Sequence, residues 1–232
     1  MSSAYLTLLL ADGRLPTGAH TQSAGVEPAL ANGMQLRQVP DYLVVRLQTV
    51  TEVEAATAVV ARHRWLNGPV GRWDAMLEVD RAWRVRTVSD ALRDASDQLG
   101  RSYLRTAGAV WDLAALEQPG VQPTGAAPHQ GVWCRAVVVG AAAAEAGLSA
   151  SETARLVGFE DVQTVIAAAL KLEPFDPAVA VGWSVAAAGE VEQLVGRVSG
   201  LTGAHEIPAH SAPLIEEWGQ RHRSAERRLF RA

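Results

Sequence analysis

The segment VWCRAVVVGAAAAEA, residues 132–146, decides the expected fold, because a helix formed by it is apolar on nearly every side. Alanine, the strongest helix former, makes up much of it, and its charged residues are Arg135 and Glu145. A helix that is apolar all round lies buried inside a protein. Gly147 follows directly, and glycine commonly ends helices. The sequence therefore predicts a central buried helix over residues 132–146.

Segments on both sides of this helix also carry helical signals. Ser149 and Glu152 are spaced as a capping box, and Asp176 before Pro177 is a favourable helix start. Strand signals are scarce, since aromatic residues make up 6% of the chain and few alternating runs are bounded by tight turns. The further helices that we expect are Ser3–Ala11, Asp41–Asn67, a segment around Trp73–Trp83, a segment from Ser89 to about Ala114, Ser149–Leu172, Pro177–Val198 and Leu214–Leu229.

These elements predict an all-α protein, a bundle of roughly eight to ten helices. At 232 residues the chain fits a single domain over 1–232, and we find no fixed repeat that would indicate a solenoid. Prolines and glycines predict a flexible loop near residues 117–130, and residues 221–232 form a C-terminal tail.

Composition narrows the possible functions. The formal net charge of −4 argues against general nucleic-acid binding, which requires a basic face. Cys134 is the only cysteine, which excludes an internal disulfide and a multi-cysteine metal centre. The longest apolar stretches are too short to span a membrane. We therefore expect a cytoplasmic protein that binds neither nucleic acid nor membrane.

Few residues suggest catalysis. His205 and His210 flank a proline and lie five positions apart, whereas the zinc-protease motif needs two histidines four apart on one helix. We expect Cys134, inside the apolar segment, to be a buried and inert thiol. No glycine-rich phosphate loop is found. We expect no catalytic residue, no metal site and no cofactor.

The two ends of the chain stand out instead. Residues 12–20 form a polar Gly/Pro-rich loop between apolar segments, in which Asp12 and Thr17 are suited to bind backbone amides. The alternative interpretation is a recognition surface. At the other end, Leu229 and Phe230 lie among arginines, and an exposed Leu-Phe pair is typical of an interface anchor.

These ends carry a family resemblance. LADGRLPTGAH (residues 10–20) followed by SAGVE (23–27) resembles the N-terminal signature of the urease accessory protein UreF family. RLFRA (228–232), separated from His222 by five residues, resembles the family's C-terminal ending, and residues 128–148 resemble its central segment. The sequence departs from the family pattern at Gly13, Gln22, Ala24, Lys171 and Ala232.

The resemblance implies a homodimeric helical scaffold without catalytic activity. Members of this family bind UreD (also called UreH) and recruit the GTPase UreG, and the assembly inserts nickel into apo-urease. The matching positions give a set of expected partner-binding residues: Asp12, Arg14, Thr17, His20, Glu27, Lys171, His222, Arg228, Leu229 and Phe230. Two alternatives stay open, a helical metal-dependent hydrolase that uses scattered histidines and acids, and a helical interaction module unrelated to urease.

Overall fold

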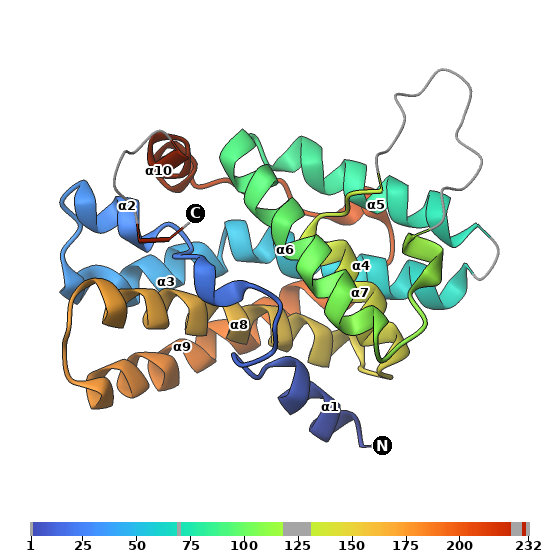
Figure 1. Cartoon of the computed structure of the whole chain (residues 1–232), viewed down its shortest axis with the longest axis horizontal. Helices are drawn as coiled ribbons and strands as arrows, with labels where there is room; N and C mark the ends of the chain where they lie inside the picture. The colour runs from blue at the N-terminus through green and yellow to red at the C-terminus, as the bar shows by residue number, and fades with distance from the viewer. Residues whose placement is uncertain (1, 69–70, 118–130, 224–228, 231–232) are drawn as a thin grey trace.

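The computed structural model describes residues 2–68, 71–117, 131–223 and 229–230, and every regular element in these ranges is helical (Figure 1). The all-α fold class is therefore confirmed. The α-helices of the described ranges are α1 (Ser3–Leu10), α2 (Val26–Ala31), α3 (Val39–Leu47), α4 (Val50–Asn67), α5 (Arg72–Arg86), α6 (Asp90–Gly108), α7 (Arg135–Glu145), α8 (Ala150–Leu172), α9 (Pro177–Val198) and α10 (Pro213–Arg223). Short 3₁₀-helices cover Ala19–Thr21, Leu36–Gln38, Ala114–Leu116 and Ala204–Glu206.

Helix α7 is the buried centre of the fold, as the sequence predicts. Residues 136–144 are all buried, and α7 packs against α4, α5, α6 and α8 (Figure 1). The crossing with α4 is so close that a Cβ atom added at Gly140 would lie 2.4 Å from the carbonyl oxygen of Ala58. Small residues therefore set the distance between these two helices.

The start of α7 differs from the expected one. The helix begins at Arg135, and Cys134 before it is extended. The N–H of Cys134 donates to Oδ1 of Asp80 at 2.8 Å, and that of Arg135 donates to Oγ of Ser96 at 3.0 Å. Side chains of α5 and α6 thus satisfy amides at the N-terminal end of α7, which lack partners within the helix.

The expectation of one helix over Asp41–Asn67 is wrong, because the chain breaks into α3 and α4. Thr49 lies at the break with φ −133° and ψ −96°. Its hydroxyl donates to the carbonyl oxygen of Val45 at 2.7 Å, and its backbone N–H donates to the carbonyl oxygen of Arg46 at 3.0 Å, three residues back and not four. Threonine can compete for backbone partners in this way, and periodicity alone did not reveal it.

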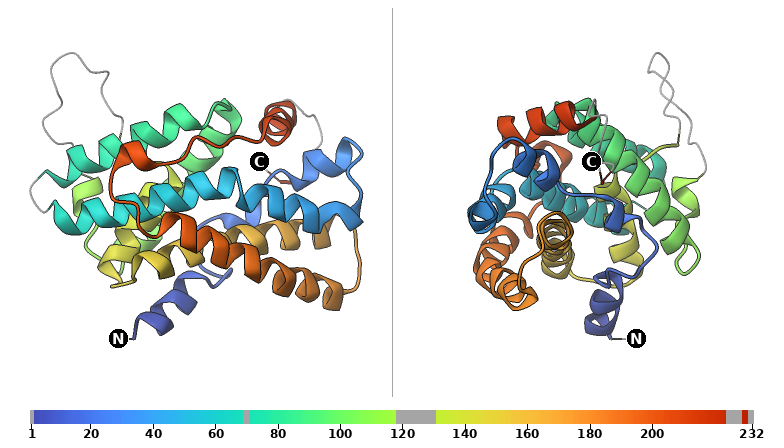
Figure 2. Two further views of the ribbon diagram at one scale, coloured as in Figure 1. Left: turned by 180° about the vertical axis from the view of Figure 1, so that it is seen from behind. Right: turned by 60° about the vertical axis from the view of Figure 1, so that its left-hand side comes forward.

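The starts of the last long helices are confirmed. The hydroxyl of Ser149 accepts the N–H of Glu152 at 3.1 Å, and the carboxylate of Glu152 accepts the N–H of Ser149 at 2.7 Å. Asp176 caps α9 by accepting the N–H of Ala178 at 2.8 Å. Helices α8 and α9 then pack against each other as a helical hairpin (Figure 2).

The structure describes the expected C-terminal helix only in part, because residues 224–228 lie outside the described residues. We expected a helix over Leu214–Leu229, but α10 ends at Arg223 within the described residues, and Leu229 and Phe230 form a bend. Helix α10 packs against α6 and α2. The loop expected near residues 117–130 lies, from residue 118, outside the described residues.

Helix α1 projects from the other helices, whereas the last described residues return to the bundle beside α2 (Figure 2). One hydrophobic cluster extends from Leu6 in α1 to Phe230 near the other end of the chain. None of the described helices has both the length and the apolar character needed to cross a membrane.

Candidate functional site

The N-terminal loop is folded on itself and on α6. Oδ1 of Asp12 accepts the backbone N–H of Arg14 at 2.9 Å, and the Arg14 guanidinium binds the same carboxylate at 2.6 Å. These bonds hold the pKa of Asp12 at about 2. Thr106 of α6 donates to the carbonyl of Pro16 at 3.1 Å. The loop therefore has a defined shape, and the expected bond from Asp12 to a backbone amide is confirmed.

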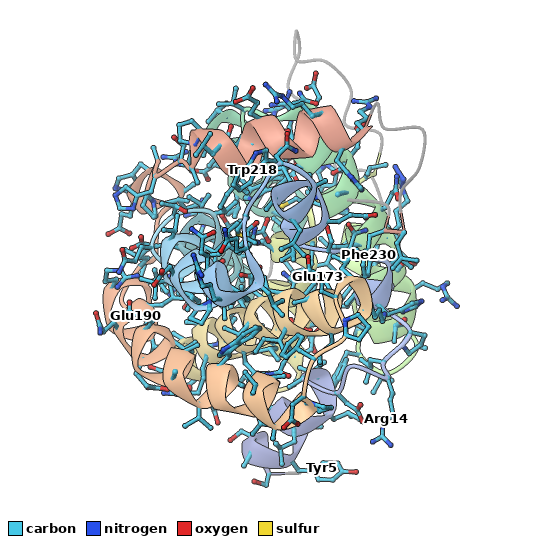
Figure 3. The ribbon with its side chains drawn as sticks, turned by 90° about the vertical axis from the view of Figure 1, so that its left-hand side faces the viewer. Tyr5, Arg14, Glu173, Glu190, Trp218 and Phe230 are labelled. Atoms are coloured by element: carbon cyan, nitrogen blue, oxygen red, sulfur yellow. The ribbon has the colours of Figure 1, made fainter. Side chains whose placement is uncertain are left out.

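Arg14 and Thr17 differ in their exposure to solvent. The Arg14 side chain is 91% exposed and projects from the body of the protein (Figure 3), whereas Thr17 is buried. Arg14 contributes its guanidinium to the surface, and Thr17 belongs to the inner side of the loop.

The second half of the loop meets the end of α8. Nζ of Lys171 donates to the carbonyl of His20 at 3.4 Å, across 151 positions of sequence. The same Nζ atom lies 5.4 Å from the ring centroid of Phe230, within the range of a cation–π interaction. Lys171 thus connects the N-terminal loop to the C-terminal tail.

The tail is held by Glu27 at the start of α2. Its carboxylate accepts the N–H of Leu229 at 2.6 Å and that of Phe230 at 2.9 Å. Nε2 of His222 lies 3.2 Å from the carbonyl oxygen of Phe230. Phe230 is only 4% exposed, while Leu229 is 64% exposed.

The expectation that Phe230 is exposed as an anchor for a partner is therefore wrong. Its ring is buried in this chain because Glu27 and His222 bond its backbone, and because Lys171 covers its ring. The neighbouring arginines in the sequence favour an exposed ring, but residues of α2, α8 and α10 together enclose it.

A cavity of about 460 Å³ lies where these segments meet. Asp12, Thr17 and His20 line it from the loop, Lys171 from α8, and Phe230 from the tail. The structure thus brings together most of the expected partner-binding residues, with Glu27, His222 and Leu229 adjoining Phe230. Arg228, also expected, lies outside the described residues.

One face of α8, which the sequence motifs do not indicate, forms the floor of this cavity. It consists of Phe159, Glu160, Gln163, Thr164, Ala167 and Ala168. These residues recur at helical spacing with Lys171, which is the signal that could have indicated them. Phe159 and Ala167 are exposed there.

A buried network of charges lies beneath this floor. Asp161 binds Nη2 of Arg46 at 2.6 Å and accepts the hydroxyl of Thr51 at 2.8 Å. Burial alone would raise the pKa of Asp161, but Arg46 and Thr51 lower it below its ordinary value. The neighbouring Glu160 is paired with Arg135, and burial raises its pKa.

These charged residues also border an inner cavity of about 150 Å³. Glu54 lines it, and burial raises the pKa of its carboxyl group. Its Oε1 atom accepts the indole N–H of Trp83 at 2.9 Å. The carboxylates and the arginines Arg46 and Arg135 occur side by side there, so the cavity lining carries charges of both signs.

His205, His210 and Cys134 occupy structural positions. Nδ1 of His210 lies 2.9 Å from Oε2 of Glu52, while His205 belongs to a short 3₁₀-helix. Cys134 is buried, and burial raises the pKa of its thiol well above the ordinary value. Among the residues that the structure describes, no three His, Cys, Asp or Glu side chains lie close enough to hold a metal ion.

Comparison with known proteins identifies the family. A family model described as UreF matches residues 36–189. The chain is 33% identical over 233 residues to a protein of Mycolicibacterium vanbaalenii named urease accessory protein UreF, with 99% of each chain covered. Proteins of the same name from Mycobacterium tuberculosis (33% over 232 residues) and Mycobacterium marinum (32% over 238 residues) are likewise covered over 99% of both chains.

The family model matches residues 36–189 and so includes neither the N-terminal loop nor the tail. The alignments with the relatives cover both segments. The segments that form the cavity are therefore part of the similarity. From this match and from the all-helical fold, the chain belongs to the UreF family of urease accessory proteins.

Proposed function

We propose that the chain is a cytoplasmic, non-catalytic scaffold for the insertion of nickel into apo-urease. In this role it acts as a homodimer and joins a UreD/UreH-type protein to a UreG-type GTPase. Nickel is cargo of the assembly and not a resident cofactor of this chain. Membership of the family favours this function over a metal-dependent hydrolase and over a module unrelated to urease.

The observation that carries the proposal is the meeting of three distant segments around one cavity. The loop at residues 12–20, the face of α8 that ends at Lys171, and the tail residue Phe230 line the same space. Enzymes also gather distant residues around cavities. Here, however, the gathered residues are those that match the family's motifs, which supports a surface used by the family's partners.

Exposed charge at the rim supports recognition of an acidic partner. Lys171 and His20 are exposed beside the cavity, and Arg14 projects from the loop. Complementary charge across an interface speeds association and selects among partners. A partner carboxylate placed at this rim would meet the exposed ammonium group of Lys171.

Helix α1 supports assembly into a larger complex. Its residues Tyr5 and Leu8 are 61% and 73% exposed, and α1 contains no charged residue. Tyr5 points away from the body of the protein (Figure 3). Grouped apolar side chains on a projecting helix are typical of a protein–protein interface, and we assign this helix to the homodimer or to the partner complex.

The decisive experiment is co-purification with UreD-type and UreG-type proteins, followed by nickel-dependent activation of urease in cells. Lys171→Glu should weaken the complex at least tenfold, since it places a negative charge at the rim. Arg81→Glu makes the same charge change at an exposed position of α5, away from the cavity, and should leave binding within about twofold.

Light scattering tests the assembly. We expect a dimer, or a protein that stays in solution only with its UreD-type partner, and Leu8→Glu should shift the dimer towards monomer. A monodisperse monomer that binds neither partner, or equal binding by the Lys171 and Arg81 variants, would contradict the proposed function.

A further inference from the structure

The two backbone amides at Leu229 and Phe230 share one carboxylate. Oε1 of Glu27 lies 2.6 Å from the amide nitrogen of Leu229, and Oε2 lies 2.9 Å from that of Phe230. The Glu27 side chain is 14% exposed. Hydrogen bonds to a charged acceptor are about twice as strong as neutral ones. The Glu27 carboxylate therefore fixes the backbone at Leu229 and Phe230 more strongly than a neutral acceptor would.

His222 completes the attachment from the last turn of α10. Its Nε2 atom lies 3.2 Å from the carbonyl oxygen of Phe230 and 3.4 Å from Oε2 of Glu27. A carbonyl oxygen only accepts, so Nε2 must carry the proton that is donated. Side chains from α2 and α10 therefore bind both backbone polar groups of Phe230.

The two tail residues face opposite ways. The Phe230 ring points inward, buried, with Lys171 over its face. Leu229, one residue earlier, is exposed. A segment held only by hydrophobic burial of its ring could rotate about that ring, whereas the bonds to Glu27 and His222 fix which side chain faces outward.

We propose that Glu27 and His222 are positioning residues that dock the tail on the chain itself. Docking builds, before any partner arrives, a composite surface of Leu229, Lys171 and the N-terminal loop. Phe230 is the internal anchor, and Leu229 is the tail residue that a protein partner contacts. This assignment rests on the proposed function for the existence of the partner, while the docking is a property of the isolated chain.

Hydrogen exchange of the complete chain without any partner tests the docking. Glu27→Gln replaces one acceptor oxygen by an amide group that repels an N–H donor. We expect the amides of Leu229 and Phe230 to exchange about tenfold faster or more, while amides in α7 keep their protection. Glu217→Gln, at an exposed glutamate of α10 paired with Arg221, is the matched control and should change neither.

A second pair of variants separates positioning from general stability. Glutamine can place an N–H donor near the position of Nε2, whereas leucine cannot. His222→Gln should therefore keep part of the protection of the Leu229 and Phe230 amides from exchange, whereas His222→Leu should lose it. Equal tail exchange in both variants, or an unchanged tail in Glu27→Gln, would overturn the docking.

Binding of the UreD-type protein tests the outward role of Leu229. Leu229→Arg should reduce affinity about tenfold or more without exposing the tail amides to exchange. Unchanged affinity in this variant would overturn the assignment of Leu229. Absence of binding by the unaltered chain would instead refute the proposed function, and the exchange result would still decide the docking.

Discussion

Nη1 of Arg46 lies 2.9 Å from the carbonyl oxygen of Ala24. Ala24 has a φ of 49°, and it is the one non-glycine residue with positive φ in the described ranges. The hydroxyl of Tyr42 donates to the same carbonyl at 2.7 Å. Two donors from α3 thus hold a backbone conformation that L-residues adopt at a cost.

This conformation gives the first prediction. Ala24→Val should lower the free energy of unfolding by about 1–2 kcal/mol, because a β-branched side chain is worse than alanine at positive φ. Ala24→Gly should stay within about 1 kcal/mol of the unaltered chain, since relief of strain is offset by greater freedom of the unfolded chain. Urea denaturation of both variants measures the difference. Equal midpoints would contradict the claim that the backbone at Ala24 is strained.

The buried pair of Arg46 and Asp161 gives the second prediction. Arg46→Ala leaves the carboxylate of Asp161 in the interior without its main partner and should cost about 3–5 kcal/mol of stability. The exposed pair of Arg155 and Glu192 provides the control, for which Arg155→Ala should cost about 1 kcal/mol or less. Similar losses of stability in both variants would show that burial of the Arg46–Asp161 pair does not raise the cost of breaking it.

Acid should weaken the fold through the same carboxylate. Because Arg46 and Thr51 lower the folded-state pKa of Asp161, its contribution to stability is complete above the unfolded value of about 3.9. That contribution is lost as the pH falls through the folded-state pKa. Urea midpoints between pH 6 and pH 2 should therefore fall less steeply for Asp161→Asn than for the unaltered chain. Parallel curves would contradict this prediction.

Two glycines in helices should respond in opposite ways to alanine. At Gly140 a Cβ atom would clash with the backbone of α4, whereas at Gly182 of α9 nothing lies within 4 Å. Gly140→Ala should destabilise the protein by about 1–3 kcal/mol through overpacking. Gly182→Ala should stabilise it by about 0.5–1 kcal/mol through helix propensity. Thermal unfolding distinguishes the two, and a gain at both positions would refute the close crossing.

The thiol of Cys134 should be unreactive in the native protein. It is buried, and its raised pKa leaves little thiolate at neutral pH, which is the reactive form. Labelling with a thiol reagent should become fast only in urea, at the concentration where the helices unfold. Rapid labelling of the native chain would show that the N-terminal end of α7 opens.

Local signals predicted most of the fold. Ser149, Asp176 and Gly147 mark helix ends through bonds to adjacent residues, and such bonds can be inferred from sequence spacing. The break at Thr49 and the start of α7 at Arg135 could not be inferred in this way. The break depends on the hydrogen bond that the Thr49 side chain makes to the backbone of Val45. The start of α7 depends on hydrogen bonds to side chains of α5 and α6.

The candidate site was predicted only as a set of residues. The resemblance indicated Lys171, His20 and Phe230, but not that Lys171 contacts the other two, because 151 positions separate Lys171 from His20. The inward direction of Phe230 was missed, since Glu27 holds it from a helix 203 positions away. Contacts of this kind follow from tertiary packing, which neighbouring residues do not encode.

The close crossing of α7 and α4 has a consequence for the entropy of folding. Long side chains lose rotational freedom when they enter a core, whereas alanine and glycine have no side-chain rotamers to lose. Where Gly140 meets Ala58 and Ala61, the two helices gain contact between their backbones and methyl groups without that loss. The alanine-rich centre thus joins its helices while freezing few side-chain torsions.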